Sequence, residues 1–212
     1  MSSIAGHGYK TRLLNPLDEF WDRRLGVRTF GYRPGSGQEG MPNWQLHYTP
    51  TPYVDIFRSL QSAALTSDDS FTDLGAGMGR AVFAAGWLGV KRATGVEILP
   101  DLHELAIQNA QCCRLVNCDI RFVCDNALNV TLADTSVLYI FHSFGDDVLR
   151  AVLRNLENRR ETSRRLRIIY MNPVFNSVLK EFHWLEQIDE VAPSRNWLST
   201  ANHYNSAIWQ SV

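Results

Sequence analysis

The sequence predicts a doubly wound α/β fold built on a mostly parallel, seven-stranded sheet with helices on both faces. From residue 70 onward, short apolar runs alternate with amphipathic segments, which is typical of repeated strand–helix units. Several runs are apolar without interruption, as expected of strands buried on both faces. The chain has 212 residues, 45% of them hydrophobic, which is enough for one domain with a full core.

The predicted elements follow one another with short connections. Val54, Phe57 and Leu60 recur at helical spacing, which predicts the first core helix. Pro100 stands at the first turn of a later helix, where proline is well tolerated. The predicted strands span residues 71–74, 93–98, 120–124, 137–141, 166–171, 184–191 and 204–210, and the predicted helices span 54–64, 80–88, 100–113, 146–156 and 174–182.

Residues 1–53 differ from the rest because they are rich in aromatic residues, glycine and proline and show no persistent period. We expect an N-terminal cap or lid with one short helix around residues 15–24, preceding a globular unit at 54–212. An extension that simply packs on the edge of the sheet is the alternative, and the sequence leaves both open.

Composition excludes several classes of protein. The 21 Lys and Arg residues nearly balance the 22 Asp and Glu residues, so the broad positive field of a dedicated nucleic-acid binder is absent and no nucleic-acid partner is expected. No apolar run approaches the roughly 20 residues of a membrane span, and the start has no signal-peptide pattern, so we expect a cytoplasmic protein without a membrane partner. The four cysteines form no C-x-x-C pair and predict buried hydrophobic side chains, with no metal site; they are Cys112, Cys113, Cys118 and Cys124.

A glycine-rich turn joins the first predicted strand to its helix. Asp73 is followed by Gly75, Gly77 and Gly79, which allow a tight turn and a close approach of a ligand to the backbone. A dinucleotide fingerprint would need its third glycine at position 80, which is Arg80. This spacing makes a nicotinamide oxidoreductase the weakest of the functions considered.

Two further carboxylates end the next predicted strands. Glu97 lies 22 residues after Gly75, where an acidic side chain can accept hydrogen bonds from both hydroxyls of a ribose. Asp125 ends the third strand and can accept from an adenine amino group. Each carboxylate alone could be a turn former, but three at successive strand ends indicate a nucleoside site.

These motifs resemble those of the class I S-adenosylmethionine-dependent methyltransferases. The stretch 71–79 is similar to the first motif of that superfamily, 95–97 to its ribose-binding acid and 123–126 to its adenine-binding motif. The segments 24–27 and 48–52, with Asn172 and Pro173, resemble a group of small bacterial methyltransferases. The glycine turn and its helix also resemble the nucleosome lysine methyltransferase branch, although this sequence has no basic nucleosome-binding tail.

The resemblance implies a Rossmann-like methyltransferase fold and S-adenosyl-L-methionine as the cofactor. The glycine turn would bracket the methionine part, Asp73 its amino group, Glu97 the ribose and Asp125 the adenine, while residues 48–51 could reach the carboxylate end. The implied cofactor-binding residues are Tyr48, Thr49, Thr51, Asp73, Gly75, Ala76, Gly77, Gly79, Glu97, Ile98, Asp125, Asn126 and Phe141.

The segment after the fourth predicted strand departs from the bacterial group. The group carries Phe-Asn-Pro-Phe-Gly there, whereas this chain places His142 and Ser143 at the Asn and Pro positions. Histidine accepts a proton near neutral pH, so His142 is the candidate general base or orienting group, with Tyr48 as a second catalytic candidate. A His142 that merely caps the following helix is the alternative.

The predicted function is methyl transfer to a nitrogen or oxygen nucleophile of a small molecule or protein side chain. The alternative is a non-catalytic module that binds S-adenosylmethionine or a partner without transferring the methyl group. The sequence identifies neither the acceptor nor the oligomeric state.

Overall fold

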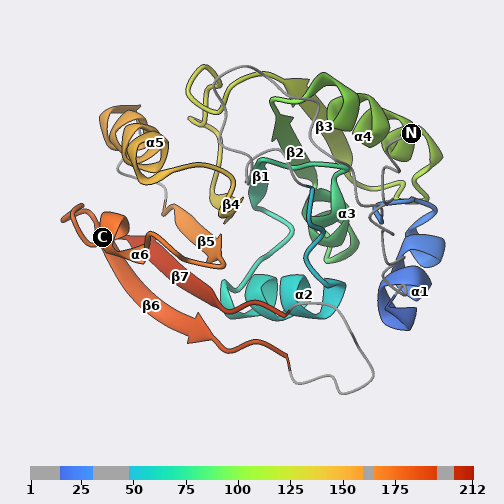
Figure 1. The fold of residues 1–212 in the computed structure, drawn as a ribbon, viewed down its shortest axis with the longest axis horizontal. Helices are drawn as coiled ribbons and strands as arrows, with labels where there is room; N and C mark the ends of the chain where they lie inside the picture. Colours follow the sequence, from blue (N-terminus) through green and yellow to red (C-terminus); the bar gives the residue numbers. More distant parts are fainter. Residues whose placement is uncertain (1–14, 31–47, 160–164, 195–202) are drawn as a thin grey trace, which may run out of the picture.

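In a computed structural model that describes residues 15–30, 48–159, 165–194 and 203–212, the chain forms one seven-stranded sheet flanked by helices (Figure 1). The strand order is β3-β2-β1-β4-β5-β7-β6, and the fold class predicted from the sequence is confirmed. The strands are β1 Ser70–Leu74, β2 Arg92–Glu97, β3 Asp119–Cys124, β4 Val137–Phe141, β5 Arg167–Met171, β6 Leu185–Val191 and β7 Ser206–Ser211.

One strand, β7, runs opposite to the other six strands of the sheet. Strands β1 to β5 are parallel to one another, whereas β7 is antiparallel to both β5 and β6. The order reverses beside β1, with β2 on one side and β4 on the other. In open α/β sheets, ligands bind at the carboxyl ends of the strands near such a reversal.

Alternating side chains of β4 build two cores on opposite faces of the sheet. Val137 and Tyr139 belong to the cluster that includes residues of α2 and α3, and Leu138 and Ile140 belong to the cluster that includes residues of α5 and α6. This double burial explains the continuous apolar run. The helices are α1 Pro16–Leu25, α2 Tyr53–Ser62, α3 Arg80–Trp87, α4 Pro100–Cys112, α5 Asp146–Arg159 and α6 Asn176–Leu179.

Helix α6 is much shorter than the predicted 174–182 because the backbone bends at both ends. Asn172 has a positive φ of 50°, and the amide of Asn176 donates to the carbonyl of Pro173 three residues earlier. The amide of Glu181 in turn donates to the carbonyl of Val178. These three-residue bonds close tight turns rather than extending an α-helix.

The short helix expected in the N-terminal segment is α1. Asn15 caps it by accepting a hydrogen bond from the amide of Leu17 at 3.1 Å, and Gly26 ends it in the left-handed conformation with φ of 79°. Trp21 packs its ring 4.7 Å from that of Phe57 in α2. The other parts of the predicted cap, residues 1–14 and 31–47, lie outside the described residues, and the boundary at residue 53 stays a prediction.

The prediction that all four cysteines are buried is wrong. Cys112 and Cys124 are exposed, and Cys113 and Cys118 are half-buried; all four are free thiols. Cys112 is the last residue of α4, and Cys124 lies on β3, an edge strand whose outward side chains face solvent. No group of three or more His, Cys, Asp and Glu side chains within the described ranges could hold a metal ion. None of the described helices has the length and apolar character needed to span a bilayer.

Candidate S-adenosylmethionine site

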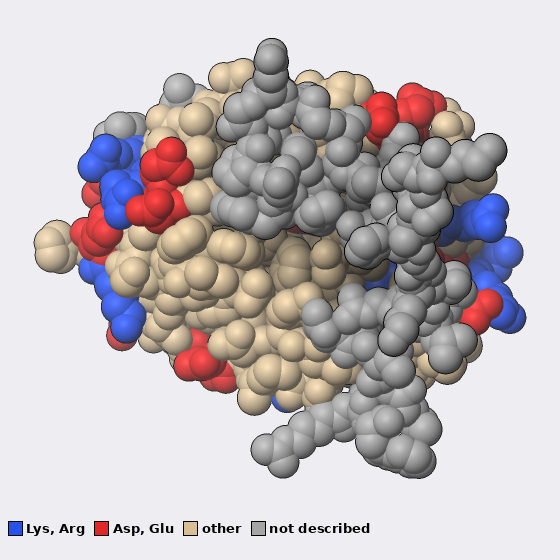
Figure 2. Space-filling view, in the orientation of Figure 1, with Lys and Arg blue, Asp and Glu red and all other residues tan. Residues whose placement is uncertain are grey.

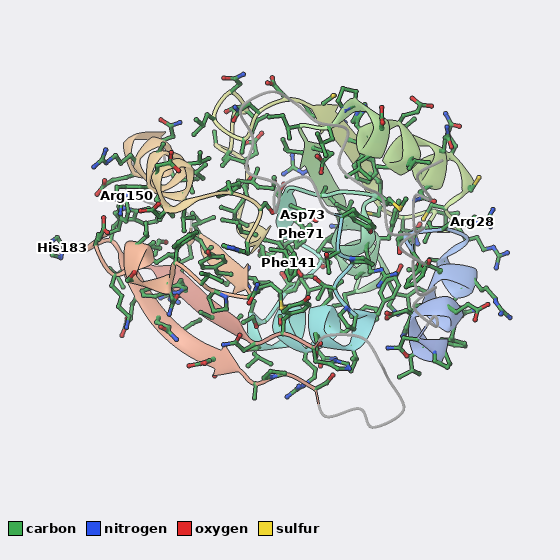
Figure 3. The ribbon with its side chains drawn as sticks, viewed as in Figure 1. Arg28, Phe71, Asp73, Phe141, Arg150 and His183 are labelled. Carbon is green, nitrogen blue, oxygen red and sulfur yellow. The ribbon has the colours of Figure 1, made fainter. Side chains whose placement is uncertain are left out.

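A cavity of about 390 Å³ opens at the carboxyl ends of the central strands. It brings together residues from segments far apart in the sequence: 48–51, the glycine turn, and the ends of β2, β3, β4 and β5. Every predicted site residue lines it except Gly79. Figure 3 shows Asp73 and Phe141 near the centre of the molecule, far from the labelled Arg150 and His183 at one edge.

Two positions of the turn require glycine, because their backbone is left-handed and because a side chain there would collide with its neighbours. Gly75 and Gly77 have φ of 85° and 54°, and a Cβ on Gly75 would lie 2.2 Å from Oγ of Ser143. A Cβ on Gly77 would lie 2.3 Å from Cε2 of Tyr48. Gly79 lies behind the turn, where a Cβ would meet the Phe122 ring at 2.5 Å. The structure therefore accounts for Gly79 through packing.

Glu97 holds the glycine turn in place from the end of β2. Its Oε2 accepts from the amide of Gly77 at 2.8 Å and its Oε1 from the amide of Leu99 at 2.9 Å. Burial raises the pKa of this carboxyl, although the backbone donors oppose the shift. Since each carboxylate oxygen has two lone pairs, Glu97 keeps acceptor capacity for a ligand hydroxyl.

Asp73 is the least satisfied carboxylate of the cavity. It is 3% exposed, and its Oδ1 is buried without a hydrogen-bond partner among the described residues. Burial and the neighbouring Glu97 raise the pKa of Asp73 well above its ordinary value. Because buried polar groups are almost always paired, this carboxylate suits a ligand that brings a donor, such as an ammonium group.

The end of β3 forms a compact turn on another side of the cavity. Oδ1 of Asp125 accepts from the amide of Asn126 at 2.6 Å and from Nδ2 of Asn129 at 2.8 Å. Asn126 in turn accepts from the amide of Leu128 at 3.0 Å. The turn-forming role and the predicted adenine contact are therefore compatible. Ile98, at the end of β2, is half-buried and also lines the cavity.

Two residues with unusual backbone conformation follow neighbouring strands. His142 after β4 and Asn172 after β5 have φ of 34° and 50°, both line the cavity, and they are two of three non-glycine residues with positive φ in the described ranges. Such strain concentrates at functional sites. The ring of His142 lies 5.3 Å from that of Phe175, and partial burial lowers the pKa of the imidazole.

Phe141 and Tyr204 form an aromatic wall at this end of the cavity, with ring centroids 4.9 Å apart. Sequence reasoning did not assign Tyr204 or Asn172 to the site. For Asn172 there was a signal, since an Asn-Pro pair directly follows an apolar strand. For Tyr204 there was none, because its proximity comes from the antiparallel return of β7 beside β5.

Arg80 also lines the cavity. The sequence analysis considered it only as the residue that breaks the dinucleotide-binding fingerprint. It is 3% exposed, its Nη1 lies 3.2 Å from Oδ2 of Asp18, and its guanidinium stacks 4.8 Å from the ring centroid of Tyr53. Nε donates to Oγ1 of Thr29, whose carbonyl accepts from the Tyr48 hydroxyl at 2.7 Å. This network fixes residues 48–51 beside the glycine turn.

Comparison with known proteins agrees with this geometry. The family model described as histone methylation protein DOT1 matches residues 48–119, which contain Tyr48, the glycine turn and Glu97. The matched stretch covers 72 of the 212 residues and includes most of the motifs that resemble the class I S-adenosylmethionine-dependent methyltransferases. No curated protein matches the sequence significantly, and the likeness of the chain to a group of small bacterial methyltransferases stays a prediction.

Several solved methyltransferases share the fold. An RNA methyltransferase from Salinibacter ruber in complex with S-adenosyl-L-homocysteine is 21% identical, with a TM-score of 0.53 over 77% of this chain and 92% of its own. Ribosomal protein L11 methylase from Lactobacillus delbrueckii subsp. bulgaricus is 15% identical (TM-score 0.55; 73% and 76% covered). Magnesium protoporphyrin IX methyltransferase from Synechocystis PCC 6803 is 13% identical (TM-score 0.56; 76% and 77%). Their acceptors differ, so this likeness concerns the fold.

Proposed function

We propose that the chain binds S-adenosylmethionine in this cavity and transfers a methyl group to a nitrogen or oxygen nucleophile of a small molecule or protein side chain. The observation that carries the proposal is the buried, unpartnered Oδ1 of Asp73 beside the glycine turn. An amino group of the cofactor would give this carboxylate the partner that it lacks.

The remaining lining residues fit the other parts of the cofactor. Glu97 keeps lone pairs for the ribose hydroxyls, Asp125 would accept a hydrogen bond from the adenine amino group, and Ile98 would supply apolar contact. The positive φ values of Gly75 and Gly77 keep the turn tight and free of side chains. When bound, S-adenosylmethionine supplies a methyl group already activated on a sulfonium.

His142 would remove or hold the acceptor proton. The lowered pKa of its imidazole keeps the ring neutral, and therefore able to accept a proton, at neutral pH. Phe141 and Tyr204 would exclude water from the acceptor end. Asn172, on the neighbouring strand end, offers an amide to orient the acceptor.

The distribution of charge supports a small-molecule or protein acceptor rather than a nucleic acid. On the face shown in Figure 2, the described Lys and Arg side chains lie beside Asp and Glu rather than forming one basic patch. For example, Arg150 forms a 2.8 Å ion pair with Glu181. A phosphate backbone would need clustered, unneutralised cations.

Calorimetric titration tests the cofactor assignment. We expect saturable one-to-one binding of S-adenosylmethionine and S-adenosylhomocysteine and no binding of NAD, because Arg80 occupies the position of the third dinucleotide glycine. Binding of NAD with similar affinity, or no heat with either sulfur ligand for the folded protein, would contradict the proposal.

A further inference from the structure

Asp55 is a buried carboxylate of α2 that has no part in the cofactor site. Its side chain is 2% exposed, and it is not among the described residues that line the cavity, although Ile56 next to it is. In the described part of the chain, the basic side chain that it contacts is His203 rather than a Lys or Arg. Burying a carboxylate is costly unless hydrogen bonds satisfy it, so the donors to Asp55 indicate what it holds in place.

The described donors to Asp55 come from the residues that follow β6 and lead into β7. Its Oδ1 accepts from the amide of Ser194 at 2.9 Å, and its Oδ2 accepts from the amide of Tyr204 at 3.4 Å. Nδ1 of His203 lies 2.8 Å from the same Oδ2 and 2.6 Å from Oγ of Ser194. Because an ionised carboxylate can only accept, this contact places the imidazole proton on Nδ1. One carboxylate of α2 therefore gathers both ends of the connection between β6 and β7.

The start of β7 is anchored independently of Asp55. The amide of Asn172, at the end of β5, donates to the carbonyl of Asn205 at 2.8 Å. The hydroxyls of Ser59 in α2 and Ser206 in β7 lie 2.7 Å apart. Loss of the Asp55 hydrogen bonds would therefore release the two residues that precede Asn205 and leave β7 in the sheet.

One of these two residues, Tyr204, lines the cavity, and its ring centroid lies 4.9 Å from that of Phe141. We propose that Asp55 is a positioning residue for methyl transfer, which acts through His203 and the amide of Tyr204 to hold the Tyr204 ring against Phe141 at the acceptor end. This inference rests on the proposed function. A misplacement of about 1 Å caused by a residue away from the chemistry can lower the rate about a hundredfold. The glycine turn is held by Glu97 instead, so loss of Asp55 should impair transfer and spare cofactor binding.

The variant Asp55→Asn tests the proposal while keeping the size of the side chain. In either orientation of the new amide, its NH₂ group faces a donor that Asp55 now accepts from. With methyl-labelled S-adenosylmethionine and a cell extract, we expect turnover at least about tenfold below that of the parent, and affinity for S-adenosylhomocysteine within about threefold of it. Asp189→Asn is the matched control, because the exposed Asp189 on β6 also accepts a hydrogen bond from α2, through Ser62.

Three results would count against the proposal. Turnover of Asp55→Asn equal to that of the parent would overturn it, and so would losses of turnover and of S-adenosylhomocysteine affinity by the same factor, which would mean that Asp55 only supports the fold. Both results leave the proposed function intact. A parent protein that binds S-adenosylhomocysteine but transfers no label would instead contradict the proposed function, and this inference with it.

A double-mutant cycle tests whether Asp55 acts through Tyr204. If it does, Asp55→Asn should lower turnover less than about threefold in a Tyr204→Ala background, against at least about tenfold in the parent. The same factor in both backgrounds would overturn the proposed route.

Substitutions of His203 decide the question should Asp55→Asn fail to fold. His203→Asn keeps an N–H donor near the position of Nδ1, whereas His203→Ala removes it. We expect turnover of His203→Asn within about threefold of the parent and turnover of His203→Ala at least about tenfold lower, with S-adenosylhomocysteine affinity unchanged in both. Equal turnover of the two variants would overturn the proposal.

Discussion

Replacing His142 by Asn is expected to lower methyl-transfer turnover about a hundredfold while leaving cofactor affinity almost unchanged. The change restores the residue that the resembled bacterial group carries, yet it removes the only imidazole among the described residues of the cavity. An amide can orient an acceptor but cannot take its proton. Turnover is to be measured at saturating S-adenosylmethionine, with the fraction of a cell extract that becomes methylated serving as the acceptor.

The pH profile distinguishes a base from an orienting group. Because partial burial lowers the pKa of His142 below the ordinary value of 6.5, the neutral form should persist into mildly acidic solution. Turnover of the parent should therefore rise through a pH below about 6.5 and then stay level. Turnover of His142→Asn should not show this rise with pH. His183→Asn, exposed and at the far edge in Figure 3, should behave as the parent. Turnover of His142→Asn within a few-fold of the parent at every pH would end the general-base hypothesis.

Glu97→Ala is expected to weaken S-adenosylhomocysteine binding tenfold or more. Each charge-assisted hydrogen bond to a ribose hydroxyl contributes on the order of 1.5–3 kcal/mol. The substitution has a second consequence, since it also removes the hydrogen-bond acceptor of the Gly77 and Leu99 amides and so loosens the glycine turn. The dissociation constant by calorimetry measures the total effect, and the exposed Glu186→Ala on β6 is the matched control.

A second ligand separates these two contributions. If Glu97 binds the ribose, the parent should prefer S-adenosylhomocysteine over its 2′-deoxy analogue, and Glu97→Ala should lose that preference. If Glu97 only supports the turn, the substitution should weaken both ligands by the same factor. That second outcome would contradict the ribose assignment.

Local patterns in the sequence were sufficient to predict most of the fold. The strand boundaries of β1 and β4 follow from apolar runs bounded by turn residues, and the glycine turn is readable because Gly75 and Gly77 occupy left-handed positions. Helix α6 was overestimated because apolar spacing around Val178 does not reveal the three-residue bonds that close the turns there.

The parts of the site that depend on distant contacts could not be predicted. Arg80 and Asp18 are 62 positions apart, and nothing in either neighbourhood indicates that they form a buried ion pair. The same holds for Tyr204, which reaches Phe141 through the antiparallel return of β7. The hydrogen bond by which Glu97 holds the glycine turn could not be predicted either. A ribose hydroxyl and a backbone amide both need a hydrogen-bond acceptor, so a carboxylate at this position is consistent with either partner.

Transfer of a labelled methyl group tests the central claim most directly. The parent protein, with methyl-labelled S-adenosylmethionine and a cell extract, should place label in the small-molecule or protein fraction. Glu97→Ala, at a cofactor concentration below saturation, should place at least about tenfold less there. Binding of the cofactor without label in any fraction would instead identify a non-catalytic module. Label confined to the nucleic-acid fraction would contradict the proposed acceptor class, and equal transfer by the parent and Glu97→Ala would contradict the assignment of this cavity.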